Sequence, residues 1–206
     1  MRIKIKSGFI ILTLMATLPA LAQESGKLFF TTSVGLISAQ GKFAKAYKST
    51  VAFNSGVEIA LKHNWYGQFV LDYNALKYDQ QIRDASSPYL FQNTNSSLLL
   101  LGLNGGKNFN FKNPKWFTSL YGGAGYLNLG EPRVTTNPVT NIANQDVVRK
   151  SNVFGRAGVR LAYKTKSNFF QTLYIDASYW ASPAKAQGGN VNGFSFYIGT
   201  RFGTVQ

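Results

Sequence analysis

The segment FFQTLYIDASYW, residues 169–180, alternates between two kinds of side chain along its length. One phase is mostly apolar and runs from Phe169 to Tyr179, whereas the other carries Asp176 and Ser178. Successive side chains of a β-strand point to opposite faces, so this period of two predicts a strand with one apolar face. The terminal aromatics are ten positions apart. At roughly 3.3 Å per residue and a tilt of about 40°, that separation spans about 25 Å along a membrane normal.

The same alternation recurs throughout the chain after residue 27. Many of these segments also carry an aromatic residue near each end, which is typical of the interfacial girdles of membrane barrels. The pattern predicts an all-β chain that forms an eight-stranded antiparallel transmembrane β-barrel. The strands are expected at about residues 27–38, 51–62, 65–76, 97–107, 116–127, 151–164, 169–180 and 193–203.

The connections between these strands alternate between short and long. Those at 62–64, 108–115 and 165–167 are short or compact, whereas those at 39–50, 77–96, 128–150 and 181–192 are long and show no periodic pattern. Bacterial barrels place short turns in the periplasm and long loops outside the cell. We therefore expect Lys45 and Gln92 to face the exterior, and His63 and Lys166 to face the periplasm.

The N-terminus resembles a cleavable secretory signal. Arg2, Lys4 and Lys6 precede an uncharged run at 7–18, and small residues follow in the pattern Ala20-Leu21-Ala22. The run is too short for a membrane anchor, which needs about 20 apolar residues. We expect residues 1–22 to be a signal peptide and 23–206 the barrel domain. Cleavage removes three positive charges, so the net charge falls from +14 to +11.

Composition narrows the class of protein further. Charged residues make up only 15% of the chain and aromatics another 15%, whereas soluble domains carry about 25% charged residues. An outer wall that faces lipid explains the deficit. The chain contains no cysteine, which excludes disulfides and thiolate chemistry. The basic residues are spread over turns and loops of an exported chain, so nucleic-acid binding is not expected.

Glycine-punctuated strands carry a family resemblance. The segments YGGAGY (121–126) and GRAGVR (155–160), together with the last strand at 194–202, resemble those of small outer-membrane β-barrel proteins of the OmpA/OmpX-like, porin-family type. Gly199 and Phe202 resemble the assembly signal of these proteins, although Thr204-Val205-Gln206 replaces the usual terminal aromatic. The resemblance implies the cell outer membrane as the location. It also implies outer-membrane lipid and lipopolysaccharide as partners, and the barrel assembly machinery during insertion.

A soluble barrel with its apolar face turned inward would show the same alternation. Glycines on the polar phase argue against it, because a solvated surface gains more from Thr, Lys or Glu, whereas a narrow tube needs small residues where its interior is crowded. These glycines are Gly56, Gly102, Gly106, Gly123, Gly125, Gly158 and Gly199.

The inward phase also carries charges of both signs, and these are the first candidate site. They are Glu58, Asp72, Arg156, Arg160, Asp176 and Arg201. A tight hairpin centred on Lys166 would place Arg156 opposite Asp176. Such a lumenal charge network either orders a closed core, since eight strands leave room for little more than side chains, or gates a narrow conduit.

Loop residues form the second candidate site. The loop at 39–50 carries basic and aromatic residues that could contact lipopolysaccharide or an unknown extracellular ligand: Lys42, Phe43, Lys45, Tyr47 and Lys48. The single histidine, His63, lies in a predicted periplasmic turn, so no catalytic, metal or cofactor site is expected. The sequence favours a structural or loop-mediated surface role with a largely closed lumen. The alternative is a narrow channel for small solutes.

Overall fold

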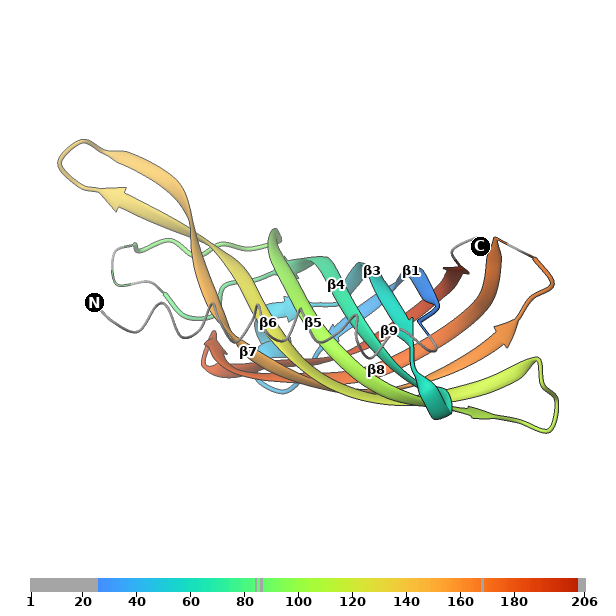
Figure 1. Cartoon of the computed structure of the whole chain (residues 1–206). Helices are drawn as coiled ribbons and strands as arrows, with labels where there is room; N and C mark the ends of the chain where they lie inside the picture. The colour runs from blue at the N-terminus through green and yellow to red at the C-terminus, as the bar shows by residue number, and fades with distance from the viewer. Residues whose placement is uncertain (1–25, 84, 86, 168, 204–206) are drawn as a thin grey trace, which may run out of the picture.

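A computed structural model describes residues 26–83, 85, 87–167 and 169–203. Within these residues the chain is almost entirely antiparallel β-structure wound into a barrel (Figure 1). The predicted signal peptide at 1–22 and the C-terminal residues 204–206 lie outside the described residues.

Eight long strands form the wall of the barrel. Each pairs antiparallel with its neighbours, and β4–β5 and β1–β9 pairings complete the ring. The predicted fold class is therefore confirmed. The strands are β1 (Leu28–Ala39), β3 (Thr50–Ala60), β4 (Trp65–Tyr78), β5 (Thr94–Asn110), β6 (Trp116–Asn137), β7 (Ile142–Lys164), β8 (Phe170–Ala186) and β9 (Gly189–Gly203).

Two connections that the sequence predicts to be irregular loops are strand extensions instead. Residues 128–150 continue β6 and β7 as a hairpin that projects beyond the rest of the barrel (Figure 1). Residues 181–192 are largely strand, with a turn at Gln187 and Gly188, both of which have positive φ. The prediction of an irregular connection at 128–150 was wrong for a physical reason. Residues 142–149 are exposed on both faces, so apolar and polar side chains do not alternate there.

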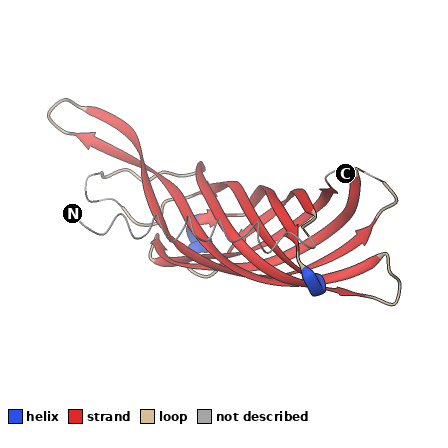
Figure 2. Ribbon diagram, viewed as in Figure 1, coloured by secondary structure: helices blue, strands red, loops and turns tan. Residues whose placement is uncertain are grey.

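The remaining connections contain the short elements of the fold. At the long-loop end, α2 (Phe43–Ala46) leads into β2 (Tyr47–Lys48), which pairs with the end of β4. At the other end, η1 (Lys62–Asn64) joins β3 to β4. Figure 2 shows these two helical segments at opposite ends of the barrel. Within the described residues, neither helical element is long and apolar enough to cross a membrane.

The wall exposes large apolar side chains and buries charged ones. Leu71, Ile175 and Phe196 are 37%, 57% and 52% exposed, whereas Asp72 and Asp176 on the opposite phase are buried. A water-soluble protein has the reverse arrangement. The exposed belt is stable only against lipid, which excludes the soluble-barrel alternative.

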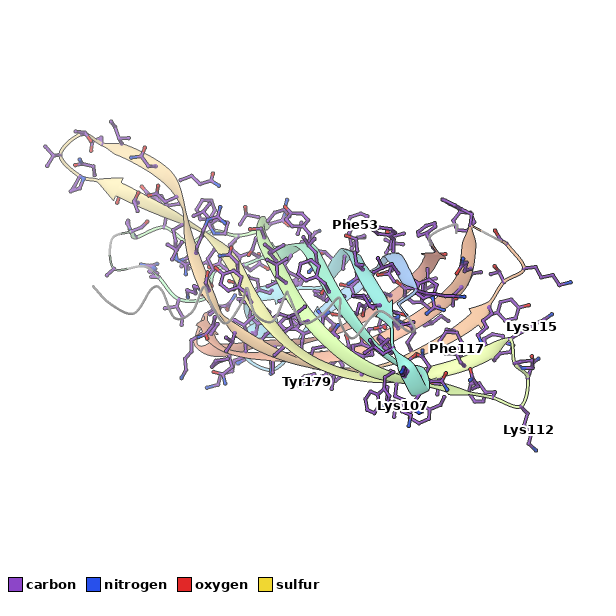
Figure 3. The ribbon with its side chains drawn as sticks, viewed as in Figure 1. Phe53, Lys107, Lys112, Lys115, Phe117 and Tyr179 are labelled. Carbon is purple, nitrogen blue, oxygen red and sulfur yellow. The ribbon has the colours of Figure 1, made fainter. Side chains whose placement is uncertain are left out.

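Aromatic residues border this belt. The rings of Tyr179 and Phe194 lie 5.0 Å apart on the outer face, and those of Trp116 and Tyr163 lie at the same separation towards the short-turn end. Figure 3 shows Tyr179 and Phe53 on the outside of the barrel. These pairs match the interfacial girdles that the sequence predicts.

Candidate functional site

The barrel interior brings together all six charged residues that the sequence singles out. Arg160 lies at the centre, with Nε 3.1 Å from Asp176 Oδ2 and one terminal nitrogen 3.0 Å from Glu58 Oε2. The second oxygen of Glu58 accepts a hydrogen bond of 2.7 Å from Arg201. We call this set, with the remaining ion pair between Arg156 and Asp72, the lumenal charge network.

The predicted partner of Asp176 is wrong. In the β7–β8 pairing Arg160 lies opposite Asp176, and Arg156 lies opposite Trp180. The hairpin is therefore centred two residues later than Lys166, which offsets the pairing by four residues. Arg156 instead reaches across the barrel to Asp72 on β4.

Polar neighbours satisfy the carboxylates of the network. Tyr121 donates a hydrogen bond of 2.6 Å to Asp176, and Asn54 donates one of 2.7 Å to Asp72. The guanidinium carbon of Arg160 lies 4.4 Å from the centre of the Tyr174 ring, in a cation–π arrangement. Three arginines balance three carboxylates, so the network carries no net charge. Such pairing is what makes buried ions tolerable.

Glycines on the inward phase create the space for these tyrosines. A Cβ atom at Gly158 would lie 2.8 Å from the Cβ of Ser178 and would also strike the Tyr121 ring. A Cβ atom at Gly199 would lie 2.6 Å from the Tyr174 ring. The crowding that the sequence predicts at these glycines is confirmed.

An apolar layer fills the interior beyond the network. On β6 the inward side chains change from Tyr121, which bonds to the network, to Leu127 and Leu129, which are fully buried. Sequence reasoning missed this layer because it treated the inward phase as polar throughout. The uninterrupted run Leu98–Leu101 was the available signal. We define the apolar layer as Ile37, Leu98, Leu100, Leu127, Leu129, Phe154 and Trp180.

A second charged group closes the long-loop end of the interior, and we call it the mouth cluster. Glu131 is fully buried and accepts hydrogen bonds from Tyr47 and from Arg133, the latter at 2.6 Å, while Lys150 Nζ lies 2.8 Å away. Arg133 also donates to the hydroxyl of Tyr78. Sequence reasoning missed this cluster because all five of its members lie in regions that the sequence assigns to loops.

The five loop candidates separate into two groups. Lys42, Lys45 and Lys48 are exposed, whereas Phe43 and Tyr47 are buried inside the barrel mouth, with their rings 4.2 Å apart. The expectation that both aromatics offer surface contacts is therefore corrected, because their side chains pack against the interior.

Lys48 links this loop to the connection between β4 and β5. Lys48 Nζ lies 2.8 Å from Asp79, which also accepts the backbone N–H of Asn93. The hydrogen bond from Lys48, together with that from Asn93, holds the pKa of Asp79 below its ordinary value. Asp79 is therefore ionised at neutral pH, so this contact joins two long loops through a charged pair.

Little open space remains between these layers. The cavity within the network, bordered by Asn104, Arg156, Tyr174 and Tyr197, has a volume of about 10 Å³. That is close to the space needed for a single water molecule.

His63, the only histidine, lies at the opposite end of the molecule from the mouth cluster, in the turn formed by η1. Across the described ranges, no group of three or more metal-ligating side chains could hold a metal ion.

Comparison with known proteins gives fold-level relationships only. No family model and no curated protein sequence matches the chain. Among solved structures, Neisserial surface protein A (NspA) superposes with a TM-score of 0.50 and 11% identity, covering 85% of this chain and 96% of that one. The chain is an outer-membrane-type β-barrel. The apolar belt and this fold together place it in the outer membrane, as the sequence predicts.

Two further structures resemble the barrel more distantly. The N-terminal β-barrel domain of Pseudomonas aeruginosa OprF has a TM-score of 0.44 and 12% identity, covering 86% of this chain and 99% of that one. The attachment invasion locus protein Ail of Yersinia pestis has the same TM-score with 15% identity, and the same coverage of both chains.

Proposed function

We propose that this barrel is an integral outer-membrane protein with a closed lumen and a structural or loop-mediated surface role, without enzymatic activity. The observation that carries the proposal is the filling of the interior. The lumenal charge network, the apolar layer and the mouth cluster follow one another along β6, and the cavity between Arg156, Arg160 and Asp176 is about 10 Å³. A hydrated solute or ion needs considerably more room than one water molecule.

The long-loop end supports the interactive part of this role. The β6–β7 hairpin projects beyond the barrel there (Figure 1). Lys42, Lys45 and Lys48 are exposed on the loop between β1 and β3 at the same end. Loops held by a rigid scaffold commonly carry binding residues. Lysines at an outer rim can pair with the phosphates of lipopolysaccharide.

Conductance of the purified protein in planar bilayers tests the closed lumen. We expect no discrete conductance steps from the parent protein. The competing function is a narrow channel for small solutes, which is favoured by the sharing of Glu58 between two arginines, since shared partners can exchange. Stable steps in the parent protein, or steps in Asp176→Asn with normal folding, would favour the channel.

Cysteine labelling on intact cells tests which end faces outward. The change Lys45→Cys should react with an impermeant maleimide, whereas His63→Cys should react only after the outer membrane is opened. Both sites are exposed in the folded barrel, so accessibility to solvent is matched. Labelling of His63→Cys alone on intact cells would reverse the orientation and remove the proposed lipopolysaccharide contact.

A further inference from the structure

The short-turn end of the barrel contains a cavity that the proposed function does not use. Its volume is about 470 Å³, and it lies between the start of β1, the β7–β8 turn and the end of β9. We call it the vestibule. Its lining includes four cations, Lys27, Lys164, Lys166 and Arg201, and no carboxylate among the described residues.

The lumenal charge network does not neutralise the lysines of the vestibule. Arg201 shares Glu58 with Arg160, and the whole lumenal charge network already balances its own charges. The three lysines are therefore additional to that balance. Lys107, Lys112 and Lys115 lie at the same end of the molecule and add to its positive potential (Figure 3). A concave site lined by charge of one sign concentrates ions of the opposite sign.

Hydroxyl groups in the vestibule provide an independent indication of a ligand. Thr172 is only 2% exposed, yet its Oγ1 has no hydrogen-bond partner in the described protein. Such an atom pays a desolvation penalty that is recovered when a partner is bound. Ser167 Oγ accepts the backbone N–H groups of Phe169 and Phe170, each at 3.2 Å, so its own proton remains available for donation.

We propose that the vestibule binds an anion that carries a phosphate group. Three lysines beyond the balance of the network suit a group of two negative charges better than a single carboxylate, and the hydroxyls of Ser167 and Thr172 add neutral donors. The volume lies within the range of small-molecule sites, about 300 to 1,000 Å³. The phosphate belongs either to a small soluble ester or to a lipid headgroup that reaches over the rim.

Titration of the folded protein in detergent micelles with inorganic phosphate tests the site. The backbone amide signals of residues 164–167 should shift with saturation, at constant ionic strength maintained with chloride. The double change Lys164→Gln with Lys166→Gln should weaken binding about tenfold or more, because two charge-assisted contacts are lost. The matched control, Lys112→Gln with Lys115→Gln, removes the same charge outside the lining and should change affinity less than about twofold.

The change Thr172→Val separates a built site from general attraction to a basic surface. Valine matches threonine in shape and removes the unpartnered hydroxyl, so the unliganded protein should unfold at the same or a higher urea concentration. Phosphate affinity should nevertheless fall several-fold. Unchanged affinity in Thr172→Val, or equal losses in both lysine pairs, would overturn the site and leave only non-specific electrostatics.

Nanodiscs distinguish the two sources of phosphate. If a lipid headgroup is the ligand, discs of phosphatidylglycerol should shift the same amide signals without added phosphate, whereas phosphatidylcholine discs should leave them in place. If a soluble ester is the ligand, the signals should respond only to added phosphate in both kinds of disc. No response to either source in any disc would contradict the proposal.

Discussion

The two halves of the barrel interior share one strand phase but are filled by opposite chemistry. Towards the short turns the inward side chains form the lumenal charge network, and towards the long loops they form the apolar layer. The side chains of both layers are buried, and in both halves the outer face is an apolar belt. The strand phase therefore specifies only which face a side chain occupies, and the filling of the lumen is decided separately in each half.

This difference predicts two kinds of response to mutation. A charged residue in the network depends on a specific partner, so a single change leaves an uncompensated buried charge. A leucine in the apolar layer depends on volume, so a truncation creates a cavity whose effect is independent of any one partner. The following changes are ordered from the largest expected effect to the smallest.

The change Arg160→Met should be the most damaging, because it leaves both Glu58 and Asp176 short of a counter-charge. We expect a loss of about 3 to 5 kcal/mol in the free energy of unfolding. Urea titration in phospholipid vesicles, followed by tryptophan fluorescence, measures it.

A double change tests whether pairing is the reason. Asp72→Leu alone should resemble Arg160→Met, whereas Asp72→Leu combined with Arg156→Met should be clearly milder, since no charge is left unpaired. If Asp72→Leu and Arg156→Met are each harmless, or if the effects of these two changes simply add in the double variant, the network is hydrated and contributes little.

The change Leu127→Ala should destabilise the other half by about 2 to 5 kcal/mol, since the side chain is fully buried in the apolar layer. Leu120→Ala is the matched control on the same strand, where the side chain is 55% exposed on the outer face. Lipid can fill the space left by Leu120, so that change should be small. Equal losses at both positions would mean that the interior is no better packed than the belt.

The outer belt is common to both halves, and Ile175→Arg tests it. A charge near the midplane should reduce stability by about 2 to 4 kcal/mol, whereas Ile175→Val should be mild. The same change at Leu71 and Phe196 should behave alike, because all three are exposed on the wall. Normal stability of all three arginine variants in bilayers would contradict the assignment of this face to lipid.

The change Tyr47→Phe should have the smallest effect, about 1 to 2 kcal/mol. It removes one donor to buried Glu131, which keeps Arg133 and Lys150 as partners. Tyr179→Phe on the outer face is the control and should be nearly neutral. A loss as large as that of Arg160→Met would show that the mouth cluster, like the network, depends on every partner.

Alternation determined the strands and which side chains share a face, and the glycines on the polar phase assigned the apolar face to lipid. These features are local, because in a period of two the apolar or polar character of each residue indicates the face to which it belongs. The six network residues were found for the same reason. The extended β6–β7 hairpin was not predicted, because residues 142–149 are exposed on both faces and their sequence therefore shows no alternation.

Only the tertiary structure decided which of these residues meet. A shift of the β7–β8 pairing by four residues leaves every side chain on its own face, so periodicity cannot distinguish Arg156 from Arg160 as the partner of Asp176. The burial of Phe43 and Tyr47 in the mouth was equally hidden, because it depends on how α2 packs against distant strands. Faces follow from local sequence, whereas register and the filling of the lumen follow from contacts between residues far apart in the chain.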